Sequence, residues 1–365
     1  MGLSKFILSL CVSILDALTF WVKPDPKRIT FISLTQDKLS GDMLQIGEAL
    51  EKQGKYDIRT NLFSYKPGLS GAFHYFCSSL RQVWDLKKSG LVIINDNNFV
   101  ISTHPIRKAK VLQVWHACGA AKKFGNEIRR QYPVANYDAV LASSDFWKPV
   151  YAKSFGVRED QVYPTGLPRN DQLLDSERQA RLQAAFRKKH PELAGKRLML
   201  YAPTFRGNIV DGMRLVQFDF EKVMAAVPED WVLLYKFHPL LKDQVSQAAR
   251  TLDVTHEDLN MLMGISDAMI SDYSSVIFDY ALLDKPLIAY LPDEEEYAKT
   301  IGLNIDYSRF AGPVAHNEDE LTEAFTQIET VPHEALQDFQ QTYIIHNDGK
   351  NTERVVKLIE KLLEA

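Results

Sequence analysis

The chain has 365 residues and a mass of 41.6 kDa, which predicts about two domains at roughly 150 residues per domain. Hydrophobic residues make up 45% and charged residues 25%, and 43 basic against 47 acidic residues give a net charge of −4. This composition is typical of a folded soluble protein and excludes a disordered chain, a fibrous repeat and a multi-pass membrane protein. The balanced charge gives no support for nucleic acid as a partner.

The N-terminal residues Phe6–Val22 form an apolar run that raises the question of a membrane. The run is short for a spanning helix, which needs about 20 residues, and Asp16 near its middle costs roughly 2.5–3.5 kcal/mol on insertion scales. It ends in bulky residues before Lys23, without the small-residue cleavage site of a signal peptide.

As a helix, the run has a polar face of Ser9, Ser13, Asp16 and Thr19. The opposite face is apolar and contains Ile7, Leu10, Ile14, Leu18 and Trp21. The pattern predicts that residues 1–24 form a helix lying in the membrane interface, anchored near its ends by Lys5 and Trp21. The alternatives are a helix packed on the protein's own core and a true span.

Short apolar runs then alternate with helix-like stretches, which predicts parallel sheets covered on both faces. In the first half the strands are expected at Ile29–Leu34, Leu91–Asn95, Val111–Trp115 and Ala139–Ser143, with helices at Leu44–Gln53 and Ser78–Lys88. In the second half the strands are expected at 197–204, 231–239, 268–272 and 286–291, with a helix at Val276–Leu283.

Two such series predict two doubly wound Rossmann-type domains that face each other across a cleft. We expect an N-terminal domain at 25–168, a C-terminal domain at 169–350 and a last helix at 351–365. The segment 166–170 (GLPRN) is interpreted as the start of the joint, followed by a charged helix at Asp175–His190. Ligands of such sheets bind beyond the carboxyl ends of the strands, so the residues after each strand are the candidates for a site.

The first candidate strand end carries His116, followed by small residues including Gly119 and then by Lys122 and Lys123. A single histidine is more often structural than catalytic, but its pKa near 6.5 makes it a workable base if it faces substrate. The two lysines are candidates for binding an acceptor diphosphate or anionic lipid, with a solvated charged face as the equal alternative.

Three strand ends in the second half carry groups suited to a nucleotide. Thr204 and Arg206 follow one strand, and a guanidinium fits a phosphate. Lys236 and His238 point to one side of the next by strand alternation. At the third, Ser274 and Ser275 precede a helix and indicate an anion site, with Asp279 one turn later as a candidate for a ribose hydroxyl. Each group taken alone also has a structural explanation, such as a turn or a helix cap.

No motif of several other enzyme classes is present in the sequence. There is no GxxxxGK[ST] P-loop, no GxGxxG turn, no HxH or HExxH metal motif and no GxSxG elbow. The three cysteines, Cys11, Cys77 and Cys118, are far apart and form no CxxC pair. They argue against a disulfide framework and a zinc site and suit a reducing compartment. No metal site is predicted and no cofactor is required, while Mg²⁺ is neither supported nor excluded.

The motifs together resemble the CDP-glycerol glycerophosphotransferase family of teichoic-acid synthesis. The resemblance covers roughly Val111–Tyr297 and rests on WHACGAAKKFG, GLPRND, YAPTFRG, KFHP and SDYSSVIFDYALLDKPLIAY, with a similar tail at 348–354. It implies a GT-B-like fold, peripheral attachment to the cytoplasmic side of a bacterial cell membrane, and transfer of an alditol phosphate from a CDP-alditol.

The resemblance also implies roles for individual residues. His116 and His238 correspond to the two catalytic histidines, and Arg206, Ser274, Ser275 and Asp279 to positions that hold the CDP-linked donor. Thr204 and Lys236 are expected on the donor side with them. Gly119, Lys122 and Lys123 are expected on the acceptor or membrane side.

The segment WHACG departs from the WHGTP found in many long polymerases and resembles the short primase-type members. The predicted function is transfer of glycerol phosphate from CDP-glycerol to a lipid-linked wall teichoic acid precursor, with release of CMP. The alternatives are a poly(glycerol or ribitol phosphate) polymerase using CDP-glycerol or CDP-ribitol, a capsule alditol-phosphate transferase and, more remotely, a GT-B glycosyltransferase using a nucleotide-sugar. A catalytically silent membrane-bound scaffold is the alternative from another class.

Overall fold

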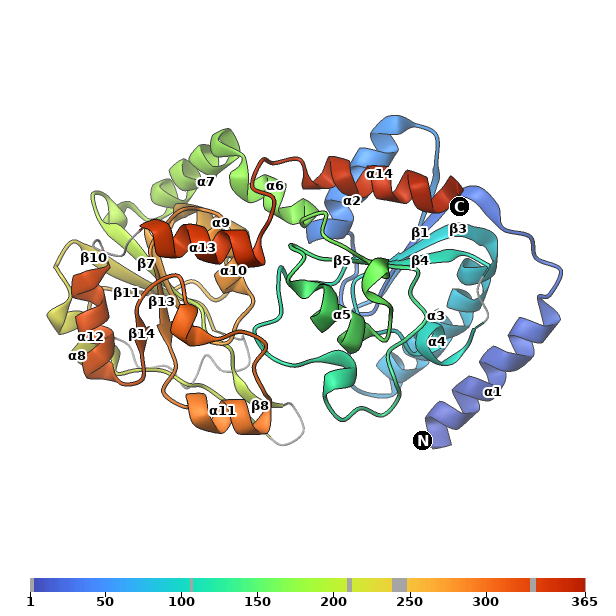
Figure 1. The fold of residues 1–365 in the computed structure, drawn as a ribbon, viewed down its shortest axis with the longest axis horizontal. Coiled ribbons are helices and arrows are strands. Elements are labelled where there is room, and N and C mark those ends of the chain that lie inside the picture. The colour runs from blue at the N-terminus through green and yellow to red at the C-terminus, as the bar shows by residue number, and fades with distance from the viewer. Residues whose placement is uncertain (1–2, 106–107, 209–211, 238–247, 329–332, 365) are drawn as a thin grey trace. The chain divides into compact units, whose positions relative to one another are not determined.

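The computed structural model describes residues 3–105, 108–208, 212–237, 248–328 and 333–364 (Figure 1). By its internal contacts the chain divides into two compact units. The first unit comprises Met1–Ala117, Phe124–Asp171 and Asp348–Ala365, and the second comprises Cys118–Lys123 and Gln172–Asn347. The last helix therefore belongs to the first unit, and a six-residue segment after His116 belongs to the second.

The first unit is built on a six-stranded sheet in which all neighbouring strands are parallel. Its central strands are buried because their residues are almost all apolar; Leu91, Val92, Ile93 and Ile94 have no exposed surface. In spatial order the strands are β2 (Asp57–Leu62), β1 (Asp25–Ser33), β3 (Ser89–Ile94), β4 (Lys110–Gln113), β5 (Ala139–Leu141) and β6 (Val162–Tyr163).

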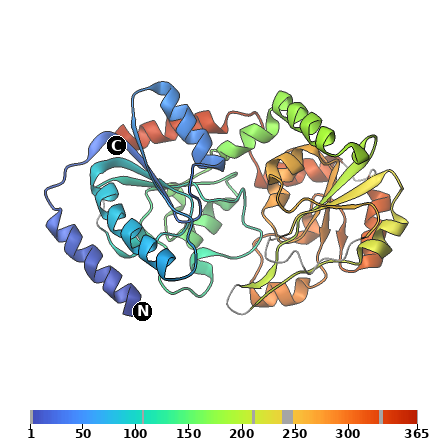
Figure 2. The same cartoon turned by 180° about the vertical axis from the view of Figure 1, so that it is seen from behind.

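Helices cover both faces of this sheet, as a buried parallel sheet requires. The C-terminal helix α14 and α2 lie on one face and α3 on the other (Figures 1 and 2). Glu360 of α14 accepts a hydrogen bond of 2.7 Å from Lys55, just after α2. The helices are α1 (Leu3–Leu18), α2 (Gly41–Gln53), α3 (Leu69–Lys88), α4 (Phe99–Thr103), α5 (Trp147–Phe155) and α14 (Asn351–Glu364). Helix α6 (Pro168–Leu174) begins in the first unit and ends in the second.

The second unit contains another six-stranded sheet with parallel neighbours and a short antiparallel hairpin. In spatial order the sheet strands are β11 (Thr251–Asp253), β10 (Trp231–Tyr235), β7 (Arg197–Tyr201), β12 (Ala268–Ser271), β13 (Leu287–Tyr290) and β14 (Val314–Ala315). The hairpin pairs β8 (Arg206–Asn208) with β9 (Gly212–Arg214), in a register that sets Arg206 opposite Arg214.

An aromatic-rich core lies against this second sheet, where Tyr201, Phe218, Phe220, Tyr235 and Phe237 pack together. The helices of the unit are α7 (Ser176–Lys189), α8 (Phe220–Ala226), α9 (Leu259–Ile265), α10 (Val276–Ala281), α11 (Glu294–Thr300), α12 (Glu318–Gln327) and α13 (His333–Tyr343).

Helix α1 packs on the first unit through Leu8 and Val12, which are buried. Part of its polar face also points inward, whereas Ser13 is exposed. The Asp16 carboxylate pairs with the Lys87 ammonium of α3 at 2.5 Å, and the Ser9 hydroxyl hydrogen-bonds the His104 ring at 3.0 Å. The opposite stripe is exposed and consists of Leu3, Ile7, Leu10, Ile14 and Leu18. Among the described residues, no helix is both long and apolar enough to cross a bilayer.

The expected strands and helices are present, but several of their bounds differ. The strand expected at 197–204 ends at Tyr201, because the Pro203 turn follows, and the helix expected at Val276–Leu283 ends at Ala281. Helix α3 begins nine residues before the expected Ser78, since its first turns carry exposed apolar side chains such as Leu69 and give no amphipathic signal.

Candidate active site

The strand order of the second sheet predicts where it binds a ligand. The chain begins this sheet at β7, adds β10 and β11 on one side, and then crosses to add β12, β13 and β14 on the other. Between β7 and β12 the connections turn in opposite directions, and ligands of open α/β sheets bind at such a point. Thr204 and Arg206 follow β7, and Asp272, Ser274 and Ser275 follow β12. Three of the four strand-end motifs therefore contribute to a single unit, and two of them meet at its switch point.

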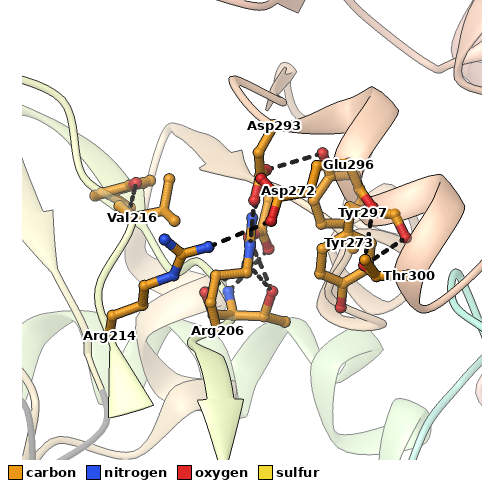
Figure 3. Close-up of polar contacts among 11 residues, drawn as sticks. Arg206, Arg214, Val216, Asp272, Tyr273, Asp293, Glu296, Tyr297 and Thr300 are labelled. Carbon is orange, nitrogen blue, oxygen red and sulfur yellow. Dashed lines mark hydrogen bonds and ion pairs between the residues drawn. The ribbon is translucent and has the colours of Figure 1, made fainter. Parts of the chain in front are cut away.

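Arg206 is the most heavily bonded residue at this switch point (Figure 3). Its Nη1 donates to the Asp272 carboxylate at 2.9 Å, and Nε and Nη2 donate to the two oxygens of Asp293 at 2.7 and 3.0 Å. Nη1 also donates to the carbonyl and hydroxyl oxygens of Thr204. The guanidinium lies against the rings of Tyr273 and Tyr297, at 4.9 and 4.7 Å from their centroids.

This arrangement makes Arg206 a bridge between three loops of the second unit. Burial disfavours the charged form, but the hydrogen bonds of Asp293 and the charge of Asp272 raise the pKa of Arg206 further above its usual range. A guanidinium has five N–H groups, and the bonds from Nε, Nη1 and Nη2 leave at most one of them, on Nη2, for a ligand. Arg206 thus holds the walls of the predicted donor site rather than presenting an open fork to a phosphate.

Thr204 and Lys236, which were also predicted on the donor side, form hydrogen bonds with different partners. The Thr204 backbone N–H and hydroxyl both donate to Asp272 at 2.8 Å. The Lys236 ammonium donates to the carbonyls of Thr255 and Glu257 at 2.8 and 2.7 Å, which ties β10 to the following turn.

Helix α10 begins directly after the two predicted serines. Ser274 and Ser275 are half-buried at that point, and neither makes a side-chain cap for the helix beyond a 3.5 Å contact from Val276 N–H to Ser274. Asp279 is buried within α10 and is engaged in interactions of its own. Among the described residues predicted to bind the CDP-linked donor, Ser274 and Ser275 therefore make the fewest polar side-chain interactions within the protein.

His116 lies in the first unit, after β4, in a backbone turn with an unusual conformation. The preceding Trp115 has φ 56°, a left-handed value that is rare for a large residue. Its N–H is held by the Gln113 side chain at 2.8 Å. His116 is exposed, and its Nδ1 lies 3.0 Å from the Asn95 carbonyl oxygen. Because a carbonyl can only accept, Nδ1 carries the proton and Nε2 carries the lone pair of the neutral ring.

Two residues that hold His116 were not singled out from the sequence. Asn95 ends the β3 strand region and supplies the carbonyl, while Arg169 donates from Nη1 to the His116 carbonyl at 2.7 Å. Arg169 is itself held by Asp42, whose carboxylate accepts from the Arg169 backbone N–H at 2.9 Å. The segment 166–170 is interpreted from the sequence as the start of the joint and as part of a family motif, without a role for Arg169, the arginine that fixes this turn.

Asp96 lies at the switch point of the first sheet, between β1 and β3. It is 6% exposed, its Oδ2 accepts from Leu34 N–H at 2.7 Å, and its Oδ1 is buried without a hydrogen-bond partner in the described part of the chain. Burial raises the pKa of Asp96 to about 6, although the Leu34 N–H opposes that shift. This carboxyl neighbours Asn95, the residue that fixes the His116 ring.

The raised pKa of Asp96 predicts a dependence of stability on pH. Between pH about 4 and 6 the folded state holds a proton that the unfolded state has lost, so the free energy of unfolding decreases as pH rises through this window. A shift of about two pKa units corresponds to on the order of 3 kcal/mol. Asp96→Asn should remove this decrease, as measured by urea denaturation at pH 4 and pH 6.5. An unchanged difference between the two pH values in the variant would contradict the assignment.

Lys122 and Lys123, which we expected on the acceptor or membrane side, lie with Gly119 in the segment that belongs to the second unit. His238 lies outside the described residues. In the part of the chain that is described, no group of three or more His, Cys, Asp and Glu side chains gathers as metal ligands.

Two units, each built on a parallel sheet covered by helices, have the architecture of a GT-B-like fold. The whole chain aligns with a solved structure of the wall teichoic acid polymerase TagF, of which the alignment covers 98%. The TM-score is 0.75 and the sequence identity is 20%. At this identity the likeness establishes the fold.

The model of the CDP-Glycerol:Poly(glycerophosphate) glycerophosphotransferase family matches residues 15–361, and the chain belongs to that family of transferases. It is 32% identical to a teichoic acid ribitol-phosphate primase of Bacillus spizizenii, over 92% of this chain and 91% of the relative. It is 27% identical to a teichoic acid glycerol-phosphate primase of Bacillus subtilis, over 96% of both chains. The resemblance inferred from the motifs is confirmed.

Proposed function

We propose that this chain transfers glycerol phosphate from CDP-glycerol to a hydroxyl of a lipid-linked saccharide at the membrane surface and releases CMP, acting as a primase. The family match over residues 15–361 carries the proposal. Similarity to primases along nearly their full length supports addition of a first unit over polymerisation.

The reaction is a phosphoryl transfer in which an acceptor oxygen attacks the β-phosphorus of the donor. A bond forms between that oxygen and phosphorus, the bond to the bridging oxygen breaks, and CMP leaves with the electron pair. The acceptor proton moves to Nε2 of His116, whose lone pair follows from the Nδ1–H bond to Asn95. Catalysis of this kind depends on positioning and charge stabilisation.

The second unit holds the donor in this proposal. The hydroxyls of Ser274 and Ser275 bind the diphosphate beside the switch point between β7 and β12. Asp279 binds the ribose, and His238 offsets the charge that develops on CMP. Thr204, Arg206 and Lys236 keep the surrounding loops in place through the contacts described above.

Transfer of ribitol phosphate from CDP-ribitol is the second candidate. It is favoured by one observation: a ribitol-phosphate primase is 32% identical to this chain, against 27% for a glycerol-phosphate primase.

The donor can be identified by thermal unfolding of the purified chain with CDP-glycerol, CDP-ribitol or a UDP-sugar. A ligand at 100 times its Kd adds about 2.7 kcal/mol of stability, which raises the Tm by about 5–10 °C for a unit of this size. We expect a shift with a CDP-alditol. A shift with the UDP-sugar alone would favour a glycosyltransferase and contradict the proposal.

We also propose that α1 attaches the chain to the cytoplasmic face of the membrane. Its inner side is occupied by Leu8, Val12 and Asp16, while the exposed stripe presents Leu10 at 52% and Ile14 at 51% exposure. A stripe of this kind buries its apolar side chains among lipid headgroups and acyl chains.

Charges placed on the stripe should abolish attachment. We expect Leu10→Asp combined with Ile14→Asp to lose most of the binding to anionic liposomes in a sedimentation assay. The control is Ala180→Asp combined with Ala184→Asp, which adds two carboxylates at the same spacing on exposed positions of α7. Equal binding by both double variants would contradict the role of α1.

A further inference from the structure

The segment Cys118–Lys123 is held in the second unit by pairing with the turn after α11. Lys122 forms an isolated antiparallel bridge with Leu303. Lys123 N–H donates to the Gly302 carbonyl at 3.0 Å, and Asn304 N–H donates to the Ala121 carbonyl at 2.9 Å. The Asn304 side chain adds a bond to the Lys122 carbonyl at 3.2 Å. The backbone at Lys122 is therefore fixed on both sides.

The two lysines of this segment have different surroundings. The stem of Lys123 covers Gly302, where an added Cβ would lie only 2.6 Å from Lys123 Cδ and where φ is +87°. Lys122 is half-buried, and the charges of Asp272 and Arg206 act on its ammonium. Burial lowers the pKa of Lys122, an effect that the Asp272 carboxylate opposes.

The turn that pairs with Lys122 is also tied to Arg206: Gly302 N–H donates to the Tyr297 carbonyl at 3.2 Å, and the Tyr297 ring lies 4.7 Å from the Arg206 guanidinium. The charges of Asp272 and Arg206 act on the Lys122 ammonium from this network. Both belong to the network at the switch point between β7 and β12 (Figure 3). In that network one guanidinium faces two carboxylates, Asp272 and Asp293, which leaves an excess of negative charge that the Lys122 ammonium offsets. Among the residues that the structure describes, the ammonium has no ion pair or hydrogen bond, so its N–H groups remain available to a phosphate.

We infer that Lys122 is a donor-binding residue whose ammonium contacts the diphosphate of the CDP-alditol and remains with the phosphate of the departing CMP. This inference rests on the proposed function and moves Lys122 from the acceptor side to the donor side. A partly desolvated ammonium binds a phosphate more strongly than an exposed one because screening by water is weaker. The segment Cys118–Lys123 follows His116 closely in the chain, so it connects the proposed general base to the donor-binding unit.

The test compares Lys122→Gln with Lys123→Gln, a neighbouring control that loses the same charge. Binding of CDP-glycerol, CDP-ribitol, CMP and cytidine is measured by titration calorimetry. We expect Lys122→Gln to weaken binding of the preferred CDP-alditol and of CMP by about 10- to 100-fold, the range for a hydrogen bond to a charged group. Cytidine, which has no phosphate, should bind within about twofold of the wild type, and Lys123→Gln should bind all ligands normally. Lys122→Arg, which keeps the charge, should bind more tightly than Lys122→Gln and serves as the folded reference.

Each other result overturns the inference. If Lys122→Gln binds CMP like the wild type, the lysine does not contact the phosphate. If both glutamine variants weaken binding equally, the effect is one of general charge. If the wild type binds neither CDP-alditol, the proposed function fails as well. If the wild type binds a CDP-alditol and Lys122→Gln binds it equally well, only the role of Lys122 fails.

Discussion

His116→Ala should lower kcat by about 10²- to 10⁴-fold while leaving the fold and the donor Kd unchanged. General base catalysis contributes an acceleration of this size, and the Nδ1–H bond to the Asn95 carbonyl fixes the tautomer that can accept the proton. Because the ring is exposed, its removal leaves no cavity in the core. The measurement is the rate of CMP release from the donor in the presence of acceptor.

The matched control is His74→Ala, which removes an exposed histidine of α3 in the same unit. It should react at the wild-type rate. The pH profile adds a second criterion: the fall in rate on the acid side, which reports protonation of the base, should disappear in His116→Ala. A near-wild-type rate in folded His116→Ala would remove this residue from the mechanism.

Arg206→Met should destabilise the chain by about 3–5 kcal/mol, the usual cost of removing one partner from a buried ion pair. Arg206 is 6% exposed, and its loss leaves the Asp272 and Asp293 carboxylates beside each other without their shared cation. Burial already raises the pKa of Asp272, although Arg206 and the Thr204 donors oppose that shift. The free energy of unfolding from urea titration at pH 7 measures the effect.

Arg214→Met is the control because Arg214 lies opposite Arg206 in the hairpin and is exposed. Arg214 forms a surface ion pair with Glu296 at an N–O distance of 3.7 Å. Its replacement should therefore lower the free energy of unfolding by less than about 1 kcal/mol. Adding Asp272→Asn and Asp293→Asn to Arg206→Met should restore part of the stability. Equal losses from the two arginine variants would show that the network does not hold these loops.

The sequence predicts the central strands of both sheets well because they are short, apolar and buried on both faces. Edge strands give weaker signals. The strand β2 has the sequence DIRTNL, in which only Asn61 is fully buried, and it was not predicted. The strands β11 and β14 have three and two residues, too few for a pattern to appear.

The sequence names candidate site residues but not the contacts between them. The strand-end rule identifies Thr204 and Arg206 because it depends only on topology. It cannot show that Arg206 meets Asp272 and Asp293, which lie 66 and 87 residues further along the chain. Asp293 follows β13 and carries no motif, so nothing in the local sequence distinguishes it.

The placement of Lys122 was also beyond sequence reasoning. A stretch of small residues followed by two lysines is consistent with an exposed loop on either side of a site. Its position depends on pairing with residues 302–304, about 180 positions away, which no local pattern reveals. The exposed apolar stripe of α1, by contrast, follows from helical periodicity, although Ser13 of the predicted polar face is exposed and Leu8 and Val12 are buried.

The central claim is that the chain moves an alditol phosphate from a CDP-alditol to a lipid-linked acceptor. The most direct test incubates the wild-type chain with CDP-glycerol or CDP-ribitol and a lipid-linked disaccharide, and then measures CMP together with the mass of the lipid product. We predict one equivalent of CMP and a product heavier by one alditol phosphate. Transfer of a sugar from a nucleotide-sugar, or no change in mass and no CMP with either CDP-alditol, would contradict the account.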